Sequence, residues 1–249
     1  MSQPQRIICT VTNDLTYDQR MRRICQTLSE VGYEVWLVGR ELPHSIALDM
    51  APFQQVRLRC RRHKGFAFYA EFNVRLFFFL LKNHFDAVGV VDTDTLTAGT
   101  MASLLKNKKR VFDAHEYFTE VPEVVNRRGV RAFWGAVERL FLPFYRHAYT
   151  VGPALADIFT QKYGILFHVV RNVPVQLPPP PPPISGPKIL LYQGALNEGR
   201  GIEAAIAAMR LLPEDYELHL AGEGDLSDAL REMARDLDKK VRFLGYLRP

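Results

Sequence analysis

The stretch that decides the fold is KILLYQGALNEGRGIE, residues 188–203. An apolar run typical of a buried strand leads into a glycine-rich turn with one arginine, and an amphipathic helix follows. Gly194, Gly199 and Gly201 allow the backbone to approach a ligand closely, and the N-terminus of the helix after them favours an anion. Arg200 lies in the turn, where its guanidinium can bind a phosphate through two parallel hydrogen bonds. The stretch therefore predicts a strand, turn and helix that bind the diphosphate of a nucleotide.

A second glycine turn supports this interpretation. The segment AGEGD, residues 221–225, follows the next predicted strand and precedes the next predicted helix. Neither turn has the Gly-x-Gly-x-x-Gly spacing of a dinucleotide site. The first turn also departs from a P-loop, because Arg200 replaces the lysine and Gly201 replaces the metal-binding serine or threonine. A kinase or an ATPase is therefore disfavoured, and the remaining alternative is that the glycines serve turn geometry alone.

Strands and helices alternate along the whole chain around this stretch. Apolar runs predict strands at 6–12, 34–39, 54–59, 87–91, 109–113, 149–151, 167–171, 188–193, 216–221 and 241–244. Helical spacing predicts helices at 17–31, 65–83, 95–105, 129–147, 153–163, 201–211 and 226–237. Such alternation with short connections favours an α/β fold, in which helices cover both faces of parallel sheets.

A run of six prolines, Pro178–Pro183, interrupts the alternation. Polyproline is stiff and extended, so we interpret residues 174–187 as a semi-rigid linker, with a ligand for an SH3 domain as the alternative. The predicted organisation is an N-terminal, acceptor-side Rossmann-like domain over 1–173 and a C-terminal, nucleotide-binding Rossmann-like domain over 188–249 that is incomplete. Two such domains in series predict a ligand cleft at the carboxyl ends of their strands.

Composition limits the partners and the location of the protein. The formal net charge of +5 suits anionic substrates or an anionic membrane surface. The hydrophobic content of 47% is ordinary for a globular protein. Nothing in this balance calls for nucleic acid. The three cysteines have no ligand spacing, so neither a disulfide framework nor a zinc site is expected. No signal peptide is visible, and the aromatic run Leu76–Leu81 is too short to span a bilayer, so we expect a cytoplasmic protein.

Three segments carry a resemblance to a known family. Tyr192–Glu203, Leu220–Asp225 and Val241–Gly245 resemble the start of the donor domain in GT-B glycosyltransferases of family 4. The resemblance implies a GT-B fold and transfer of a sugar, with retention of configuration, from a UDP- or GDP-linked sugar. That nucleotide sugar is a substrate, and neither a cofactor nor a metal is implied. The phosphate-binding turn departs from the family pattern, which usually has an arginine in place of Ala195 and a lysine in place of Arg200.

The resemblance also implies roles for individual residues. His115, just after the strand at 109–113, is expected to face the transfer centre, with Glu116 and Asp113 to orient it, or else to link a loop. On the acceptor side we place Asn13, Asp14 and Arg20; for Asn13 and Asp14 a turn or a helix N-cap is the alternative. The donor-binding residues implied are Gly194, Asn197, Gly199, Arg200, Gly201, Glu223 and Gly224.

One further motif, Asp92-Thr-Asp94, has two interpretations. In the GT-A class of glycosyltransferases an Asp-x-Asp after an apolar strand binds a metal ion beneath the donor phosphates. We favour the other interpretation, a turn in which Asp94 caps the next helix, because a GT-A fold leaves the second glycine-rich half unexplained.

The last expectations concern completeness and acceptor. The resemblance implies a Glu-x7-Glu pair later in the donor domain, which this sequence does not contain before Pro249, so we expect little or no transferase activity and an unpaired apolar sheet edge. The implied acceptor is a glycan or a lipid-linked glycan in surface polysaccharide synthesis, and Phe77–Phe79 permits a peripheral contact with the inner membrane face. The alternatives are a non-catalytic binding or partner module and a sugar-nucleotide epimerase of GT-B fold.

Overall fold

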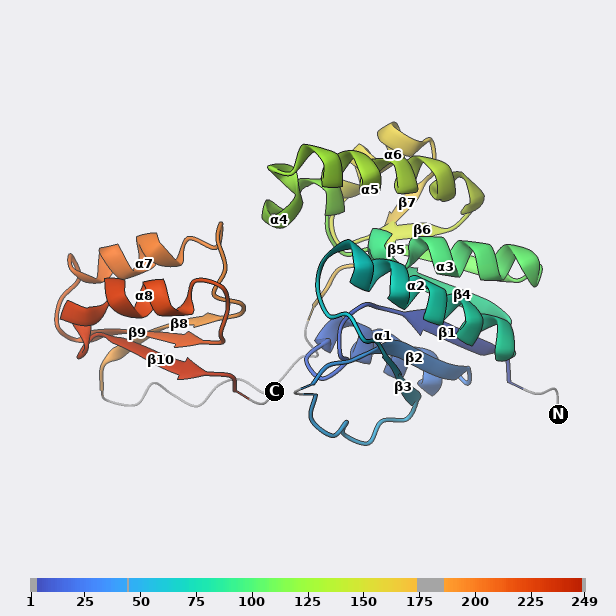
Figure 1. The fold of residues 1–249 in the computed structure, drawn as a ribbon. Coiled ribbons are helices and arrows are strands. Elements are labelled where there is room, and N and C mark those ends of the chain that lie inside the picture. The colour runs from blue at the N-terminus through green and yellow to red at the C-terminus, as the bar shows by residue number, and fades with distance from the viewer. Residues whose placement is uncertain (1–3, 44, 174–185, 248–249) are drawn as a thin grey trace. The chain divides into compact units, whose positions relative to one another are not determined.

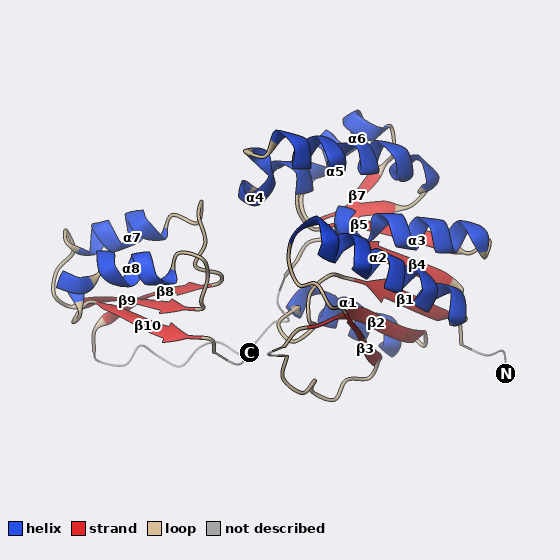
Figure 2. Ribbon diagram, in the orientation of Figure 1, coloured by secondary structure: helices blue, strands red, loops and turns tan. Residues whose placement is uncertain are grey.

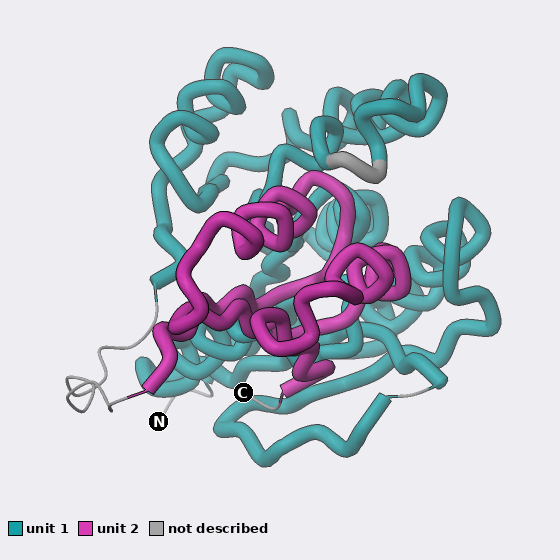
Figure 3. Tube along the Cα trace, turned by 90° about the vertical axis from the view of Figure 1, so that its left-hand side faces the viewer, with its two compact units in different colours: residues 1–174 teal, residues 175–249 magenta. Residues whose placement is uncertain are grey.

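The computed structural model describes residues 4–43, 45–173 and 186–247, with the side chains of Pro122 and Glu123 excluded. The chain divides into two compact units, unit 1 at 1–174 and unit 2 at 175–249 (Figure 3). Both units are α/β, as the sequence predicts. Of the linker predicted at 174–187, residues 174–185 lie outside the described residues.

Unit 1 is built on a parallel sheet of seven strands with helices on both faces (Figures 1 and 2). The strands are β1 (Arg6–Thr10), β2 (Glu34–Glu41), β3 (Gln54–Arg59), β4 (Ala87–Val91), β5 (Lys109–Ala114), β6 (Ala148–Thr150) and β7 (Phe167–Val169). The α-helices are α1 (Gln19–Glu30), α2 (Gly65–Lys82), α3 (Asp92–Leu105), α4 (Pro122–Val125), α5 (Arg128–Phe141) and α6 (Pro153–Tyr163). Two short 3₁₀ turns, η1 (Phe118–Glu120) and η2 (Leu142–Phe144), flank α4 and α5.

The strand order fixes where a ligand can bind. The order is β3-β2-β1-β4-β5-β6-β7, so the chain builds outward from β1 in one direction and then starts again at β4 on the other side of β1. In parallel α/β sheets the loops at such a switch point diverge and leave a crevice at the carboxyl ends of the strands. A ligand site in unit 1 is therefore expected at the loops after β1 and β4.

The alternation of side chains along β1 and β2 separates two hydrophobic cores. Ile8 and Val38 pack into the larger core, which α2, α3, α5 and α6 cover. Cys9 and Leu37 point to the opposite face and pack against α1. Because both faces of the central strands are covered, their sequences are apolar throughout rather than alternating.

The aromatic run 76–81 lies in α2 and faces the larger core with part of its surface. Phe72, Leu76 and Leu80 are fully buried, and Phe79 is partly buried against the same core. Phe78 on the opposite side is 54% exposed. No helix among the described residues is long and apolar enough to cross a membrane.

Two helices end several residues before their predicted C-terminal bounds. The helix predicted at 129–147 ends at Phe141, and Pro143 lies in the 3₁₀ turn that follows. Proline has no amide hydrogen and clashes with the carbonyl four residues earlier, so it ends a helix within one turn. The helix predicted at 226–237 likewise ends at Met233 and continues as the 3₁₀ turn η3 (Arg235–Leu237).

Unit 2 has a parallel sheet of three strands in the order β10-β9-β8. Its elements are β8 (Lys188–Gln193), α7 (Ile202–Met209), β9 (Tyr216–Ala221), α8 (Ser227–Met233) and β10 (Val241–Gly245). Figure 1 shows α7 and α8 over the same face of this sheet. Their apolar residues enclose a small core with the central strand, including Leu196, Ile206 and Leu220, which are fully buried.

The first strand of unit 2 is an exposed edge. Ile189, Leu190 and Leu191 of β8 are 55, 41 and 62% exposed, and only β9 pairs with this strand among the described residues. The unpaired edge was expected at the third strand, β10, where Leu244 is 39% exposed, so the exposed apolar edge at β8 is a separate feature of this sheet.

A close contact between α3 and β4 gives a test of the fold of unit 1. A Cβ atom added at Gly99 would lie 2.3 Å from Cγ2 of the fully buried Val90. We expect Gly99→Ala to lower the free energy of unfolding by about 1–3 kcal/mol, because the core has no room for the methyl group. Gly135 of α5 has open space around its Cβ position, so Gly135→Ala is the control. This substitution should raise the free energy of unfolding by at most about 1 kcal/mol. Urea denaturation measures both; an equal loss in the two variants would contradict the packing described.

Candidate functional site

Asn13 and Asp14 form the turn after β1, at the switch point of the sheet. Asn13 Oδ1 accepts a hydrogen bond from the backbone N–H of Leu15 at 2.9 Å, and Asp14 Oδ1 accepts one from the N–H of Thr16 at 3.1 Å. These bonds hold Leu15 at a φ of +71° with its side chain fully buried. The N-cap of α1 is Asp18 rather than either of these residues. Both side chains therefore serve the turn, and their role toward an acceptor stays a prediction.

The end of β4 is tied to the β1 loop by a buried carboxylate. Asp94, only 8% exposed, accepts a hydrogen bond from the Thr12 hydroxyl at 2.5 Å. The prediction that Asp94 caps the next helix is wrong, because α3 already begins at Asp92 and has no side-chain cap. Asp92 has a φ of +55°, which turns the chain sharply from strand to helix. The hydrogen bond between Thr12 and Asp94 thus joins the loop after β1 to the start of α3 at the switch point.

A buried ion pair lies at the carboxyl end of β5. Arg20 of α1 is 7% exposed and Asp113 is 2% exposed, and Nη2 of the arginine donates to Asp113 Oδ1 at 3.0 Å. Nη1 donates to the carbonyl of Val170 at 3.2 Å, and the guanidinium lies 5.9 Å from the ring centre of Tyr149. Arg20 therefore joins α1 to β5 and to the segment after β7 from inside the protein.

His115 lies between two carboxylates. Its Nε2 is 2.9 Å from Asp113 Oδ2, and its Nδ1 is 3.9 Å from Asp92 Oδ2. Its backbone N–H also donates to Asp92 Oδ1 at 2.8 Å. The side chain keeps 18% of its surface exposed. The structure thus brings His115, Asp113 and Arg20 together, and it adds Asp92 to the group.

These contacts favour a charged imidazole. Burial alone would lower the pKa of His115, but the hydrogen bond with Asp113 and the charge of Asp92 outweigh it and raise that pKa above its usual value. Burial raises the pKa of Asp92 to about 8, against the opposing effect of His115. Burial also raises the pKa of Asp94 to about 6, against the hydrogen bond from Thr12. The cluster therefore binds protons more tightly than its isolated groups would.

The arrangement leaves one ring nitrogen of His115 open to a ligand. Nε2 is already bonded to Asp113, whereas Nδ1 is too far from Asp92 for a hydrogen bond and remains available to a ligand. An imidazolium donates through both nitrogens and cannot accept a proton. Glu116 is exposed and has no hydrogen bond or ion pair with any residue that the structure describes, so it is not brought to His115.

In unit 2 the two glycine turns pack against each other. The N–H of Gly194 donates to the carbonyl of Ala221 at 2.9 Å, and the N–H of Leu226 donates to the carbonyl of Leu196 at 2.9 Å. A Cβ atom added at Gly222 would lie 1.9 Å from the carbonyl oxygen of Gly194. The close approach of the two backbones therefore requires glycine, as well as the φ of +137° at Gly222.

Two of the predicted donor residues support this paired turn. Asn197 Oδ1 accepts from the N–H of Asp225 at 3.0 Å and so bridges the two turns. Glu223 pairs with Arg231 of α8 at 2.7 Å. A Cβ atom at Gly224 would lie 2.4 Å from Asn197 Oδ1, so Gly224 is required by the same contact. These side chains shape the turns, and their contact with a nucleotide stays a prediction.

Arg200 is the free cation of this region. It is exposed and forms no hydrogen bond or ion pair within the described part of the chain. Gly199 and Gly201 on either side have φ values of +80° and +71°. Gly201 is the N-cap of α7 and has no side chain to occupy the free amides of the first turn. The guanidinium and the start of α7 thus lie next to each other in the chain, both open to an anion.

Sequence reasoning missed the contact between Asp92 and His115 and the bridging role of Asn197. The signal for the first lay in the fold, since β4 and β5 are neighbours and the residues after neighbouring parallel strands meet at one edge. Across 4–43, 45–173 and 186–247, no group of three or more His, Cys, Asp or Glu side chains has the geometry to hold a metal ion.

Comparison with known families gives one match. The sequence model of Glycosyltransferase Family 4 matches residues 19–174, which is more than half of the chain. No curated protein matches the sequence.

Solved structures show the same fold. Sucrose-phosphate synthase from Thermosynechococcus elongatus has a TM-score of 0.71 at 16% identity, with 98% of this chain and 71% of that chain covered. Anabaena Alr3699/HepE in complex with UDP and glucose has a TM-score of 0.67 at 12% identity, with 98% and 70% covered. The apo form of the lipopolysaccharide outer core galactosyltransferase WaaB has a TM-score of 0.59 at 15% identity, with 98% and 68% covered. At these identities the likeness shows the fold, two Rossmann-like domains of the GT-B type with a second domain that this chain covers in part.

The raised pKa of Asp92 predicts how stability depends on pH. A folded-state pKa of about 8, against an ordinary carboxyl value, means that the folded protein binds this proton more tightly than the unfolded chain. Stability from Asp92 is then present at low pH and is lost as the pH rises toward 8. Asp92→Asn keeps the acceptor for the His115 N–H and tolerates the left-handed backbone. Between about pH 5 and pH 8, we expect the free energy of unfolding of the variant to rise relative to that of the wild type by at least about 1.4 kcal/mol, as measured by urea denaturation.

Asp86 provides a control of opposite sign. The backbone N–H of Arg6 lowers the pKa of Asp86, so its contribution is lost as the pH falls rather than as it rises. Asp86→Asn should therefore differ from the wild type in stability above about pH 4 and approach it below. A wild-type protein and an Asp92→Asn variant with parallel stability curves from pH 5 to pH 8 would contradict the raised pKa of this half-buried carboxyl group.

Proposed function

The chain belongs to glycosyltransferase family 4, and on that premise we propose that it transfers a sugar, with retention of configuration, from a nucleotide sugar to a glycan or lipid-linked acceptor. The observation that carries the proposal is the paired glycine turn of unit 2 with Arg200 beside it. Backbone amides there can hold a diphosphate at close range, and the guanidinium neutralises its charge. No metal is needed for this role.

The solved structures support a nucleotide-sugar substrate. Anabaena Alr3699/HepE is bound to UDP and glucose in its structure. In this chain, three glycines with positive φ, Gly194, Gly199 and Gly201, lie along the turn that leads into α7. We propose that this turn holds the diphosphate of a UDP- or GDP-linked sugar, with Glu223 and Gly224 on the nucleotide side.

His115 is the proposed transfer-side residue. Its imidazolium has one nitrogen bonded to Asp113 and the other available, so it can donate to a sugar hydroxyl or to a developing negative charge. Arg20 then acts through Asp113, which it holds in place from the interior. Glu116 forms no hydrogen bond or ion pair with a described side chain of this group and is the weaker of the two catalytic candidates.

Surface polysaccharide synthesis at the inner membrane face is the proposed setting. A lipopolysaccharide galactosyltransferase is among the structures of similar fold. On the surface of unit 1, Phe78 of α2 is 54% exposed. Phe66 and Phe133, 67% and 42% exposed, meet edge to face at a ring-centre distance of 5.3 Å. Exposed aromatic side chains of this kind suit a peripheral contact with lipid.

Substitution of Arg200 tests the donor site. We expect Arg200→Ala to weaken binding of the preferred nucleotide sugar by about tenfold or more, since a charge-assisted bidentate contact is lost. The affinity of Arg200→Lys should lie between those of the wild type and Arg200→Ala, because lysine keeps the charge and lacks the planar guanidinium. Titration calorimetry with UDP, GDP and ADP sugars measures the affinity, after a thermal-shift screen has found the base.

Arg235→Ala is the matched control, since Arg235 is an exposed arginine of unit 2 that pairs with Glu232 at 3.1 Å and with no other described residue. Nucleotide affinity that is the same in the wild type and in Arg200→Ala would contradict the proposed donor site. Binding without sugar transfer would favour the non-catalytic module, and a change of the sugar without any acceptor would favour an epimerase.

A further inference from the structure

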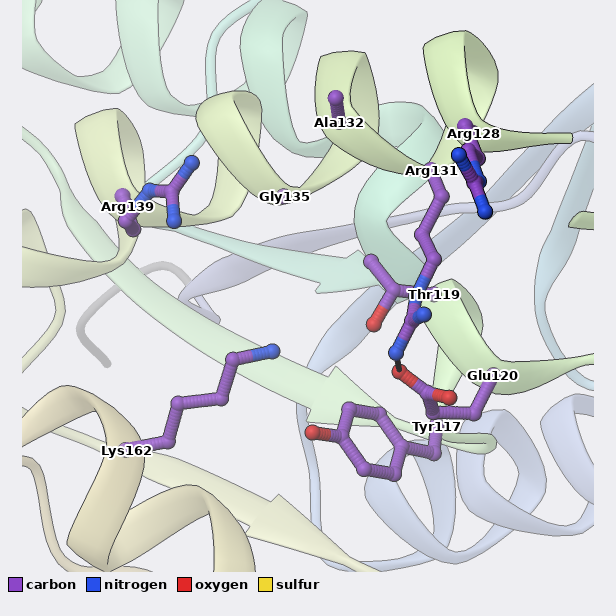
Figure 4. Close-up of a pocket in the computed structure, with 9 residues that line it drawn as sticks. All are labelled: Tyr117, Thr119, Glu120, Arg128, Arg131, Ala132, Gly135, Arg139 and Lys162. Carbon is purple, nitrogen blue, oxygen red and sulfur yellow. Dashed lines mark hydrogen bonds and ion pairs between the residues drawn. The ribbon is translucent and has the colours of Figure 1, made fainter. Parts of the chain in front are cut away.

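Unit 1 has a second candidate site, a pocket of about 580 Å³ bounded by η1, α5 and α6 (Figure 4). One face of α5 forms a wall, since Arg128, Ala132, Gly135 and Arg139 recur at helical spacing. The small side chains in the middle of this row leave the space that the pocket occupies. The opposite wall begins at Tyr117, two residues after His115.

The pocket is strongly basic. Four of its lining residues are cationic and Glu120 alone is acidic. Arg131 pairs with Glu120, and Nζ of Lys162 lies 3.6 Å from the buried Glu138. Arg128 and Arg139 are exposed and have no hydrogen bond or ion pair with any side chain that the structure describes. Two uncompensated positive charges therefore face the pocket from opposite ends of one helix.

A buried hydroxyl without a partner lies in the same pocket. Thr119 is 3% exposed, and its Oγ1 has no hydrogen-bond partner among the described side chains and backbone. Figure 4 shows this oxygen pointing into the space between the arginines of α5 and Lys162. A buried hydroxyl that forms no hydrogen bond costs free energy, so it is usually bonded. An acceptor-rich ligand in the pocket would satisfy it.

We propose that this pocket binds the phosphate or diphosphate group of the acceptor. Phosphate oxygens accept hydrogen bonds only, which fits a hydroxyl donor and guanidinium groups. Arg128 and Arg139 neutralise the charge, and Thr119 donates to one oxygen. Assigning the anion to the acceptor rests on the proposed sugar transfer, whereas the anion site itself lies within unit 1 and is tested by binding alone.

Pyrophosphate is the probe, and titration calorimetry of the whole chain is the measurement. All variants carry Arg200→Ala, so that the turn of unit 2 does not contribute. We expect Thr119→Val to weaken pyrophosphate binding by about tenfold, the loss of one hydrogen bond to a charged group. The double variant Arg128→Gln with Arg139→Gln should weaken it at least as much. Thr119→Val should not lower the thermal midpoint, because its hydroxyl has no partner in the protein.

The control removes the same charge elsewhere on unit 1. Arg61 and Arg62 are exposed, and among the described residues only their backbone N–H groups form hydrogen bonds, so Arg61→Gln with Arg62→Gln should leave pyrophosphate binding unchanged. An equal loss in this control, or unchanged binding in Thr119→Val, would overturn the proposal. Without Arg200→Ala, UDP affinity should be the same in the pocket variants as in the wild type. If UDP does not bind while the pocket still takes pyrophosphate, the proposed donor function fails and the pocket stands.

Vesicle flotation distinguishes two sources of the anion. One set of vesicles contains phosphatidylcholine alone, and the other contains phosphatidylcholine and phosphatidic acid in equal parts. Binding to the second set that is lost in the Arg128→Gln and Arg139→Gln double variant supports a lipid-borne phosphate. Pyrophosphate binding without vesicle binding supports a soluble phosphate. Failure of both probes overturns the proposal.

Discussion

The buried ion pair between Arg20 and Asp113 is the constraint on which the candidate site of unit 1 depends. Asp113 ends β5 at 2% exposure, and its second oxygen is the one that meets Nε2 of His115. Removing the arginine would leave that carboxylate buried without its cation, which is strongly destabilising. A hydrophobic pair of the same volume could give equal stability, but it could not position His115 or raise its pKa. The ion pair therefore makes sense as a means of positioning.

A steric constraint has the corresponding role in unit 2. The carbonyl of Gly194 approaches Gly222 so closely that no side chain fits between them, and Asn197 fixes the same approach through the backbone of Asp225. The two turns therefore behave as one rigid loop pair at the ends of β8 and β9. These contacts lie on one side of the loop pair, whereas Arg200 is exposed and forms no hydrogen bond or ion pair in the part of the chain that the structure describes. A rigid turn with free amides and a free cation holds a phosphate without first having to become ordered.

The fold could be predicted from the sequence to a large extent, because short apolar runs such as 87–91 and helical stripes such as Phe72, Leu76 and Leu80 are local signals. Pro143 is likewise a local signal, since a proline two residues beyond Phe141 indicates the end of α5 there. The site was less predictable. Whether Asp92 meets His115 depends on which strands are neighbours, and whether Asp94 caps a helix or binds Thr12 depends on the β1 loop. Both are properties of the assembled sheet.

The charges of unit 1 fall into two groups of opposite character beside one strand end. Around His115, Asp92 and Asp113 lie against the imidazole and Asp113 also pairs with Arg20, and burial raises the pKa of Asp92 and of Asp94, so this group takes up protons. Further along the chain, the α5 pocket has two arginines that form no hydrogen bond or ion pair with a described side chain. An acceptor that carries a phosphate would be attracted by the second group and not by the first. The anion would then be held at the pocket, and the neutral sugar hydroxyl of the acceptor would be the part free to meet His115. Separate binding of the charged and reacting ends also follows the general rule that contacts remote from the reaction orient the reacting group.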